Sequence, residues 1–551
     1  MKKNIIFKGL GAAMIAGAMT SCSSDYLDLN PITEVDNSAV VNNESAIKTA
    51  LYGIFQLQYK QYSNLYDWYW FNGEPWVSMV YGDLLSQDYV SNFFMARVPT
   101  LTDWSLMVNP AAYATLDAWT YGYNMISQCN NIIAVDKEDL EGEVAFRMAQ
   151  AYTMRAHAYY RLLQIYGPRK ADSNGGSADA VIIRTPENAV DENVPLSSFG
   201  DVVKLIYSDL DRALALYNAS GTSRQNIWET DAQITQGIYA RVALLNEDWQ
   251  TAYNMATAAR QGYRVMSMGE YSTFGFDDDS NPEWMWGTEN TSVNLYYASY
   301  GATYACNGAY VILWGSYGCG SVNMDLYRQV YNPGDIRCAR FFTPDKVAEE
   351  EQANFWDPNY VSPTNMNIAQ SGFRSQFTNY IIDMEDLIYK DNWNTYDAYY
   401  NGGNVVAGFG THFKFWGTDV YSGSSFPFMR TSEMILTAAE AACHLNNNQA
   451  AQQLVDEIQS NRIAGYTSPN LSGQDLLDYV KLVRRWELWG EGFNWFDFKR
   501  WNVPVVRNAW VQGDPTSNNI PASQAKTFPT NYNNGWKWSI PNRELNYNGA
   551  L

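Results

Sequence analysis

The chain has 551 residues with 37 Lys or Arg and 58 Asp or Glu, which gives a formal charge of −21. An acidic protein is a poor partner for nucleic acid or for anionic lipid headgroups. Its six cysteines and three histidines weigh against a disulfide framework, a His-rich zinc site and a Ser–His–Asp or Cys–His catalytic group.

The N-terminus has the layout of a secretory signal. Three lysines within the first eight residues precede an apolar run that is too short to span a bilayer. Residues 19–22, Met-Thr-Ser-Cys, resemble the lipobox of bacterial lipoproteins, in which cleavage before the cysteine is followed by its acylation. We therefore expect a signal peptide at 1–21, lipid on Cys22 and a linker at 22–44. The alternative is an ordinary signal with a cysteine there by chance.

Apolar residues at helical spacing predict a mostly α-helical body over residues 45–551. Single helices are expected at 45–60, 116–133, 142–166 and 202–217. Two tight helix pairs follow, at 231–246 with 248–261 and at 430–446 with 448–463. Alanines recur where the paired helices would touch, and the pairs resemble tetratricopeptide units. The scaffold would lie mainly within 45–61, 109–264 and 429–501.

Two long segments lack this periodicity. Residues 62–108 and 265–425 are rich in Gly, Asn, Tyr and Trp, with short strand-like runs such as 283–286. Irregular segments on a rigid scaffold commonly carry function. These two loop-rich regions are therefore the predicted ligand-binding half.

Five segments resemble motifs of the SusD-like (RagB/SusD) lipoproteins, in the order found in that family. They are CSSDYLDLNP at 22–31, FRMAQAYTMRAHAYYRLLQIYGP at 146–168, FPFMRTSEMILTAAEA at 426–441, RRWELWGEGFNWFDFKRW at 484–501 and IPNRELNYNGAL at 540–551. The chain departs from the family pattern at Asn494, where Arg is usual, and at Gly549, where Pro is usual.

The resemblance implies a function as well as a fold. SusD-like proteins have four tetratricopeptide-like helix pairs supporting an irregular binding half, and they sit on the outer face of the outer membrane. They bind glycans or other nutrients, cover a SusC-like TonB-dependent transporter and are not enzymes. The resemblance therefore implies a glycan ligand, a transporter partner and no catalytic residues.

The charged residues of the matched motifs are expected to be structural. We interpret them as a scaffold network beneath the binding half, in which charges three or four positions apart pair along a helix. They are Glu433, Glu440, Arg484, Arg485, Glu487, Glu491 and Arg500.

The aromatic residues of the two loop-rich regions are the candidate glycan-binding residues. Pyranose C–H groups stack on aromatic faces. Asp accepts hydrogen bonds from sugar hydroxyls, and Asn can both accept from them and donate to them. The first set is Trp68, Trp70, Trp76 and Tyr81 with Asp67, Asn72 and Asp83; the second is Tyr296, Tyr297, Tyr300, Tyr304, Trp314 and Tyr317. Each could instead be a loop-packing residue.

Several alternatives stay open at this level. A lipid-anchored glycoside hydrolase would need two carboxylates about 5–10 Å apart, and the chain has many Asp and Glu. A family member that binds peptides or another non-glycan nutrient would also use an aromatic groove. Residues 277–281, Asp-Asp-Asp-Ser-Asn, are either a solvated acidic turn or a Ca²⁺ site. Cys306 and Cys319 could form a disulfide.

Overall fold

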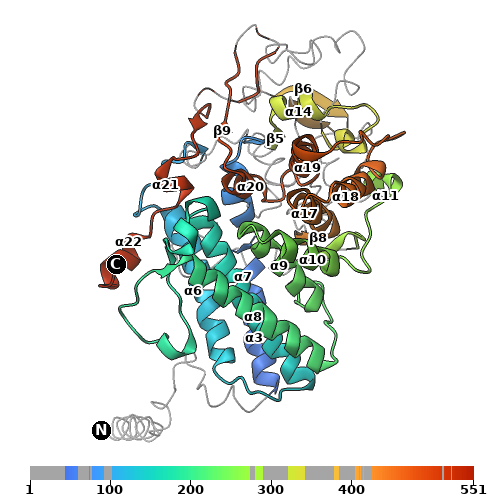
Figure 1. Ribbon diagram of the computed structural model, residues 1–551. Helices are drawn as coiled ribbons and strands as arrows, with labels where there is room; N and C mark the ends of the chain where they lie inside the picture. Colours follow the sequence, from blue (N-terminus) through green and yellow to red (C-terminus); the bar gives the residue numbers. More distant parts are fainter. Residues whose placement is uncertain are drawn as a thin grey trace, which may run out of the picture. The chain divides into compact units, whose positions relative to one another are not determined.

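Alternating buried and exposed side chains at helical spacing produce the long helices of the computed structural model (Figure 1). The structure describes residues 44–59, 73–74, 77–91, 102–273, 280–289, 320–341, 378–383, 404–408, 410, 412, 414, 425–511, 514, 516–520, 522 and 524–551. The chain divides into two units, residues 1–49 and residues 50–551. Helix α3 (Glu44–Tyr59) matches the first predicted helix.

Three long helices pack side by side in the order α6, α7, α8 (Figure 1). Their bounds are Tyr113–Ile133, Gly142–Tyr166 and Phe199–Ser220. Helix α7 is buried on nearly all sides from Ala145 onward, because it packs against α6 and α8 and also contacts α9. Gly167 caps its C-terminus, and there the Lys499 ammonium donates to the carbonyls of Gln164 (2.6 Å) and Gly167 (3.0 Å). A lysine at a helix C-terminus satisfies carbonyls that the helix itself leaves free.

Two helix pairs form where the sequence predicts them. The first is α9 (Ala232–Leu245) with α10 (Trp249–Ala259), and the second is α17 (Thr431–His444) with α18 (Asn448–Ser460). Each turn contains a residue with positive φ, Glu247 at 59° and Asn446 at 58°. Buried alanines on α10 and α17 let these two helices pack directly against each other. The mostly α fold class is thus confirmed, while the tetratricopeptide character of the pairs stays a prediction.

The remaining helices of the described part are shorter or lie near the C-terminus. They are α11 (Met268–Thr273), α14 (Met324–Val330), α19 (Gly473–Glu487), α20 (Asn494–Trp501), α21 (Asn533–Trp536) and α22 (Asn542–Tyr547). Short 3₁₀ segments lie at Lys170–Asp172, Asn174–Gly176, Pro186–Asn188 and Ile336–Arg340. Within the described residues, no helix is both long and apolar enough to cross a membrane.

All strands of the described part pair in antiparallel two-stranded sheets. The pairs are β1 (Tyr89–Ser91) with β5 (Gly320–Val322), β2 (Asp179–Val181) with β3 (Ser197–Ser198), β4 (Trp284–Gly287) with β8 (Pro427–Arg430), β6 (Thr378–Asp383) with β7 (Asn404–Gly408), and β9 (Val505–Val506) with β10 (Thr527–Phe528). Strand β4 confirms the strand-like run predicted at 283–286.

The first predicted loop region contains a regular element that periodicity did not indicate. A π-helix, η2 (Val77–Leu84), packs against α20. At this contact a Cβ on Gly82 would lie 2.2 Å from the carbonyl oxygen of Gly492, so only glycine permits the approach. The prediction that 62–108 is loop-rich did not anticipate η2, which long-range packing against α20 stabilises.

Candidate functional site

The first predicted binding loop is anchored on α7 through Glu74. This carboxylate is buried and accepts hydrogen bonds from His157 Nε2 (3.1 Å) and Arg161 Nε (2.6 Å). Burial alone would raise the pKa of Glu74, but Arg161 and His157 hold that pKa well below its usual range. Burial lowers the pKa of His157 despite the nearby carboxylate. The group is therefore an ionised Glu74 paired with Arg161 and accepting from a neutral imidazole.

The strand that precedes the second predicted binding loop contacts the same histidine. Trp286 lies in β4, the strand that precedes residues 290–318, and its ring meets the His157 imidazole edge-on at 5.3 Å. Its indole Nε1 donates to the carbonyl of Trp228 (3.0 Å), and its ring also contacts Phe428 at 5.1 Å. Both loops are thus anchored against one side chain of α7.

The chain segments that follow the two loops are joined as well. Strand β1 comes directly after residues 65–88 and strand β5 comes directly after 290–319. They pair with Tyr89 opposite Val322 and Val90 opposite Ser321. Tyr89 also stacks on Trp489 with ring centroids 5.0 Å apart. Strand pairing therefore joins two segments about 230 positions apart in the chain, each directly after a predicted loop.

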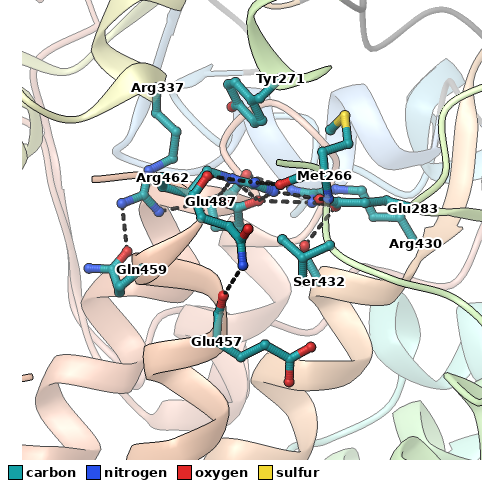
Figure 2. Close-up of polar contacts among 12 residues, drawn as sticks. Met266, Tyr271, Glu283, Arg337, Arg430, Ser432, Glu457, Gln459, Arg462 and Glu487 are labelled. Carbon is teal, nitrogen blue, oxygen red and sulfur yellow. Dashed lines mark hydrogen bonds and ion pairs between the residues drawn. The ribbon is translucent and has the colours of Figure 1, made fainter. Parts of the chain in front are cut away.

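A buried charge network lies next to strand β4 (Figure 2). Glu487, at the end of α19, accepts from Arg430 Nη1 (2.9 Å), Arg462 Nη2 (3.0 Å) and Arg337 Nη1 (3.0 Å). Glu283, just before β4, pairs with Arg430 at 2.6 Å and also with Arg462. All five side chains are at most 3% exposed. The network links β4, β8, the 3₁₀ segment Ile336–Arg340 and the ends of α18 and α19.

Glu491 and Lys414 add two further charges to the network. This carboxylate accepts from Arg430 Nε (2.6 Å) and from Lys414 Nζ (2.6 Å). Lys414 also donates to the carbonyls of Glu487 and Trp489. Burial lowers the pKa of Lys414 to about 8, although Glu491 acts in the opposite direction. The segment after α19 is thereby held to residue 414 of the second loop-rich region.

Three of the remaining motif charges, Glu440, Arg484 and Arg500, form a second cluster with Asp497. Arg500 pairs with both oxygens of Glu440, and Arg484 pairs with Asp497 at 2.7 Å. Burial would raise the pKa of Glu440, but Arg500 and the other donors outweigh it and hold the pKa at about 2. A general acid needs a raised pKa, so this glutamate has the properties of a structural ion pair.

The structural role expected for the motif charges agrees with this geometry, but the expected pairing along one helix is mostly wrong. Only Arg500–Asp497 among the motif charges is a pair three positions apart. The other partners come from separate segments, as in Arg485 with Asp88 at 2.7 Å. Helix α19 ends at Glu487, which directs the last charges of the motif away from its axis. Asn494, where the family usually has Arg, donates to Asp88 as well.

Two of the predicted glycan-binding residues are corrected by the structure. Tyr81 is 0% exposed, its hydroxyl donates to the Ala114 carbonyl, and its ring contacts Trp538 at 4.8 Å. Asp83 is 1% exposed and accepts from the backbone N–H of Gly492 at 2.9 Å. Both belong to the packing of η2 rather than to a ligand surface.

The other predicted site residues lie outside the described residues. They are Asp67, Trp68, Trp70, Asn72, Trp76, Tyr296, Tyr297, Tyr300, Tyr304, Trp314 and Tyr317, together with Cys22, Cys306, Cys319 and Asp277–Asp279. Among the residues that are described, no cluster of His, Cys, Asp or Glu is arranged to hold a metal ion.

Sequence reasoning missed the anchors of the loops. Glu74 is the only residue with a carboxylate side chain between Asn72 and Trp76. His157 and Arg161 lie one helical turn apart on α7. A buried helix face with two basic groups at this spacing requires a negative partner. That requirement was a signal for Glu74, although the sequence names no specific partner.

Comparison with known proteins places the chain in a family. Residues 351–551 match the model of the SusD family, and residues 25–244 match a model described as starch-binding associating with outer membrane. A SusD-like protein of Bacteroides ovatus is 24% identical over 362 residues, which cover 61% of this chain and 60% of that protein. SusD-like protein P25 of Formosa agariphila is 22% identical over 513 residues, 88% of each chain.

The chain thus spans less than two thirds of the first of these relatives and most of the second. A crystal structure of a SusD-like carbohydrate binding protein from Bacteroides vulgatus superposes with a TM-score of 0.68 at 21% identity, covering 92% of this chain and 97% of that one. A putative sugar binding protein from the same species gives a TM-score of 0.66 at 19% identity, with 93% and 98% covered. These structural matches establish the fold, and with the two family matches they show that the protein belongs to the SusD-like family.

Proposed function

We propose that the protein is a cell-surface lipoprotein that captures an oligosaccharide or polysaccharide and delivers it to a TonB-dependent outer-membrane transporter. The observation that carries the proposal is the shared anchoring of the two aromatic loop regions. Glu74 and Trp286 both contact His157, and β1 pairs with β5. A ligand surface made from two distant segments requires such a common support.

Membership of the SusD-like family supports the ligand class. One matching family model is described as starch-binding and associating with the outer membrane, and a structural relative is described as a carbohydrate binding protein. The lipobox-like Cys22 supports attachment to that membrane through acyl chains. Two or more chains anchor a protein stably, whereas one chain binds only marginally.

The proposal is for binding without catalysis. The motif glutamates are buried in ion pairs with arginine, as in Glu433 with Arg241 at 2.7 Å and Glu487 with three arginines. A glycosidase needs two carboxylates that face the substrate, one of them with a raised pKa. The charged residues of the family motifs supply neither property.

The ligand contacts are proposed to come from the aromatic residues of the two loops. Each stack of a sugar on Trp or Tyr is expected to contribute about 1 kcal/mol, by analogy with aromatic pairs. After the cost of association, a few stacks give dissociation constants of roughly micromolar to millimolar. Such affinity suits a protein that must release its ligand to a transporter.

The proposal is tested by isothermal titration of the mature protein with a panel of polysaccharides and peptides. Trp70→Ala and Trp314→Ala should each weaken glycan binding about five- to tenfold, which corresponds to about 1 kcal/mol. Tyr547→Ala is the matched control, because Tyr547 is 80% exposed on α22 and lies outside both loops. Its affinity should equal that of the unmodified chain.

Three results would contradict the proposal. Binding to peptides and to no glycan would assign another nutrient. Release of reducing ends that a carboxylate substitution abolishes would assign a hydrolase. Full affinity in both tryptophan variants would remove the loops from the ligand site.

A further inference from the structure

A small cavity lies where α7, α9 and α20 meet, and none of its lining residues belongs to 65–89 or 290–318. Its volume is about 30 Å³, and its walls include Tyr160, Leu244 and Phe493. Roughly 10–15 Å³ is enough for one water molecule. The cavity can therefore hold one or two guests of that size and cannot hold a sugar.

Positive side chains dominate the cavity wall. The cationic residues that line it are Arg169, Lys170, Arg241, Arg484, Lys499 and Arg500, whereas the lining carboxylates are Glu433 and Asp497. The arginines have carboxylate partners. Lys170 instead donates to the amide oxygen of Asn246 (2.9 Å), and Lys499 donates to backbone carbonyls of α7. Neither lysine forms an ion pair with any residue that the structure describes.

Arg241 presents an unsatisfied donor at this cavity. Its Nε and Nη2 each hold a Glu433 oxygen at 2.7 Å, and the side chain is 3% exposed. Its Nη1 is buried and has no hydrogen-bond partner within the described part of the chain. Buried guanidinium N–H groups almost always have an acceptor, and the cavity that Arg241 lines has room for one.

We propose that this cavity binds a small inorganic anion of the halide class, which accepts from Arg241 Nη1 and balances the two lysines. A halide ion can accept hydrogen bonds from several donors at once. It also carries a negative charge, which water does not. Coulombic attraction is stronger among partly or fully buried side chains than in bulk water. The site goes beyond the proposed function, because it lies in the scaffold and involves no residue of either loop.

A bound anion would change the charge state of Lys499. Burial, together with nearby Lys537 and Arg169, holds the pKa of Lys499 well below its usual value. A bound anion would raise the pKa of Lys499 and so favour its ammonium form. The ammonium group donates the hydrogen bonds that the α7 carbonyls accept. Occupancy of the cavity would therefore strengthen the contact between α20 and the C-terminus of α7.

The test combines halide titration with crystallography of the full mature protein. At constant ionic strength, replacing sodium gluconate by sodium chloride should raise the unfolding temperature through binding to the folded state. Lys170→Met should reduce this halide-dependent shift by at least half. Lys204→Met, at an exposed position of α8, is the matched control and should retain the shift of the unmodified chain. General salt effects act alike on all three proteins, so the differences between them isolate the site.

Crystals grown in bromide give the direct test. An anomalous scattering peak inside the cavity, within hydrogen-bond distance of Arg241 Nη1, supports the proposal. A cavity that contains only water, with bromide confined to the surface, overturns it. Equal halide-dependent shifts for Lys170→Met and Lys204→Met also overturn it, because they would show only general screening.

Discussion

Glu74 and His157 lie 83 positions apart in the chain, and their side chains meet at 3.1 Å in the buried interior. The contact joins an aromatic loop region to the helix that carries the family motif at 146–168. Trp286, which leads into the other loop region, contacts the same imidazole. Glu74 and Trp286, one from each loop-rich region, thereby share one support on α7.

Removing the charge of Glu74 is predicted to destabilise the fold. Glu74→Gln leaves Arg161 buried without its carboxylate, and breaking a buried ion pair costs about 3–5 kcal/mol. Urea unfolding should show this loss, and titration should show weaker glycan binding because the first loop loses its anchor. Glu138→Gln, at an exposed position between α6 and α7, should leave both unchanged. Unaltered stability of Glu74→Gln would contradict the anchoring role.

Tyr81→Phe is predicted to separate stability from binding. The substitution removes the hydroxyl that donates to Ala114 and should lower the free energy of unfolding by about 1 kcal/mol. Glycan affinity should be unchanged, since the ring is fully buried. Trp70→Ala should lower the glycan affinity and leave the free energy of unfolding unchanged. A loss of affinity in Tyr81→Phe without a loss of stability would return Tyr81 to the ligand site.

The charge network of Figure 2 predicts unequal effects for two glutamates. Glu487→Gln leaves three buried arginines without their shared carboxylate and should cost about 3–5 kcal/mol. Glu457→Gln breaks a pair with Arg260 whose glutamate side chain is 36% exposed, and it should cost less than about 1 kcal/mol. Chemical unfolding of both variants checks the ranking, and equal losses would refute it.

Glu440 should contribute a pH-dependent part of the stability. Its folded-state pKa of about 2 lies below the ordinary 4.5, because the ion pair with Arg500 outweighs burial. The contribution is therefore fully present above about pH 4.5 and is lost as the pH falls toward 2, with a size on the order of 3 kcal/mol. The stability difference between the unmodified chain and Glu440→Gln should shrink as the pH falls from 5 to 3. A constant difference would show that Glu440 has no lowered pKa.

Cys22→Ala should abolish membrane attachment. Without the thiol the chain cannot take up labelled palmitate, and it should leave the membrane fraction. Cys443→Ala is the matched control, because Cys443 is a half-buried thiol on α17. Its variant should stay acylated and membrane-bound. Retention of Cys22→Ala in the membrane fraction would contradict lipid anchoring at this residue.

Local sequence determined the helices of the scaffold. The predicted helix at 142–166 coincides with α7, Gly142–Tyr166, and the predicted helix at 45–60 differs from α3 by one residue at each end. Helical periodicity is a property of neighbouring residues, because each turn presents the same face to the core. The helix pairs follow for the same reason.

Tertiary structure alone decided which distant residues meet. The partners of Glu487 lie on three other segments, and β1 pairs with β5 across about 230 positions. The same long-range packing turned 77–84 into a π-helix and buried Tyr81 and Asp83. Composition identified this region as aromatic and polar, but burial depends on the segments that cover a residue, and local spacing does not encode them.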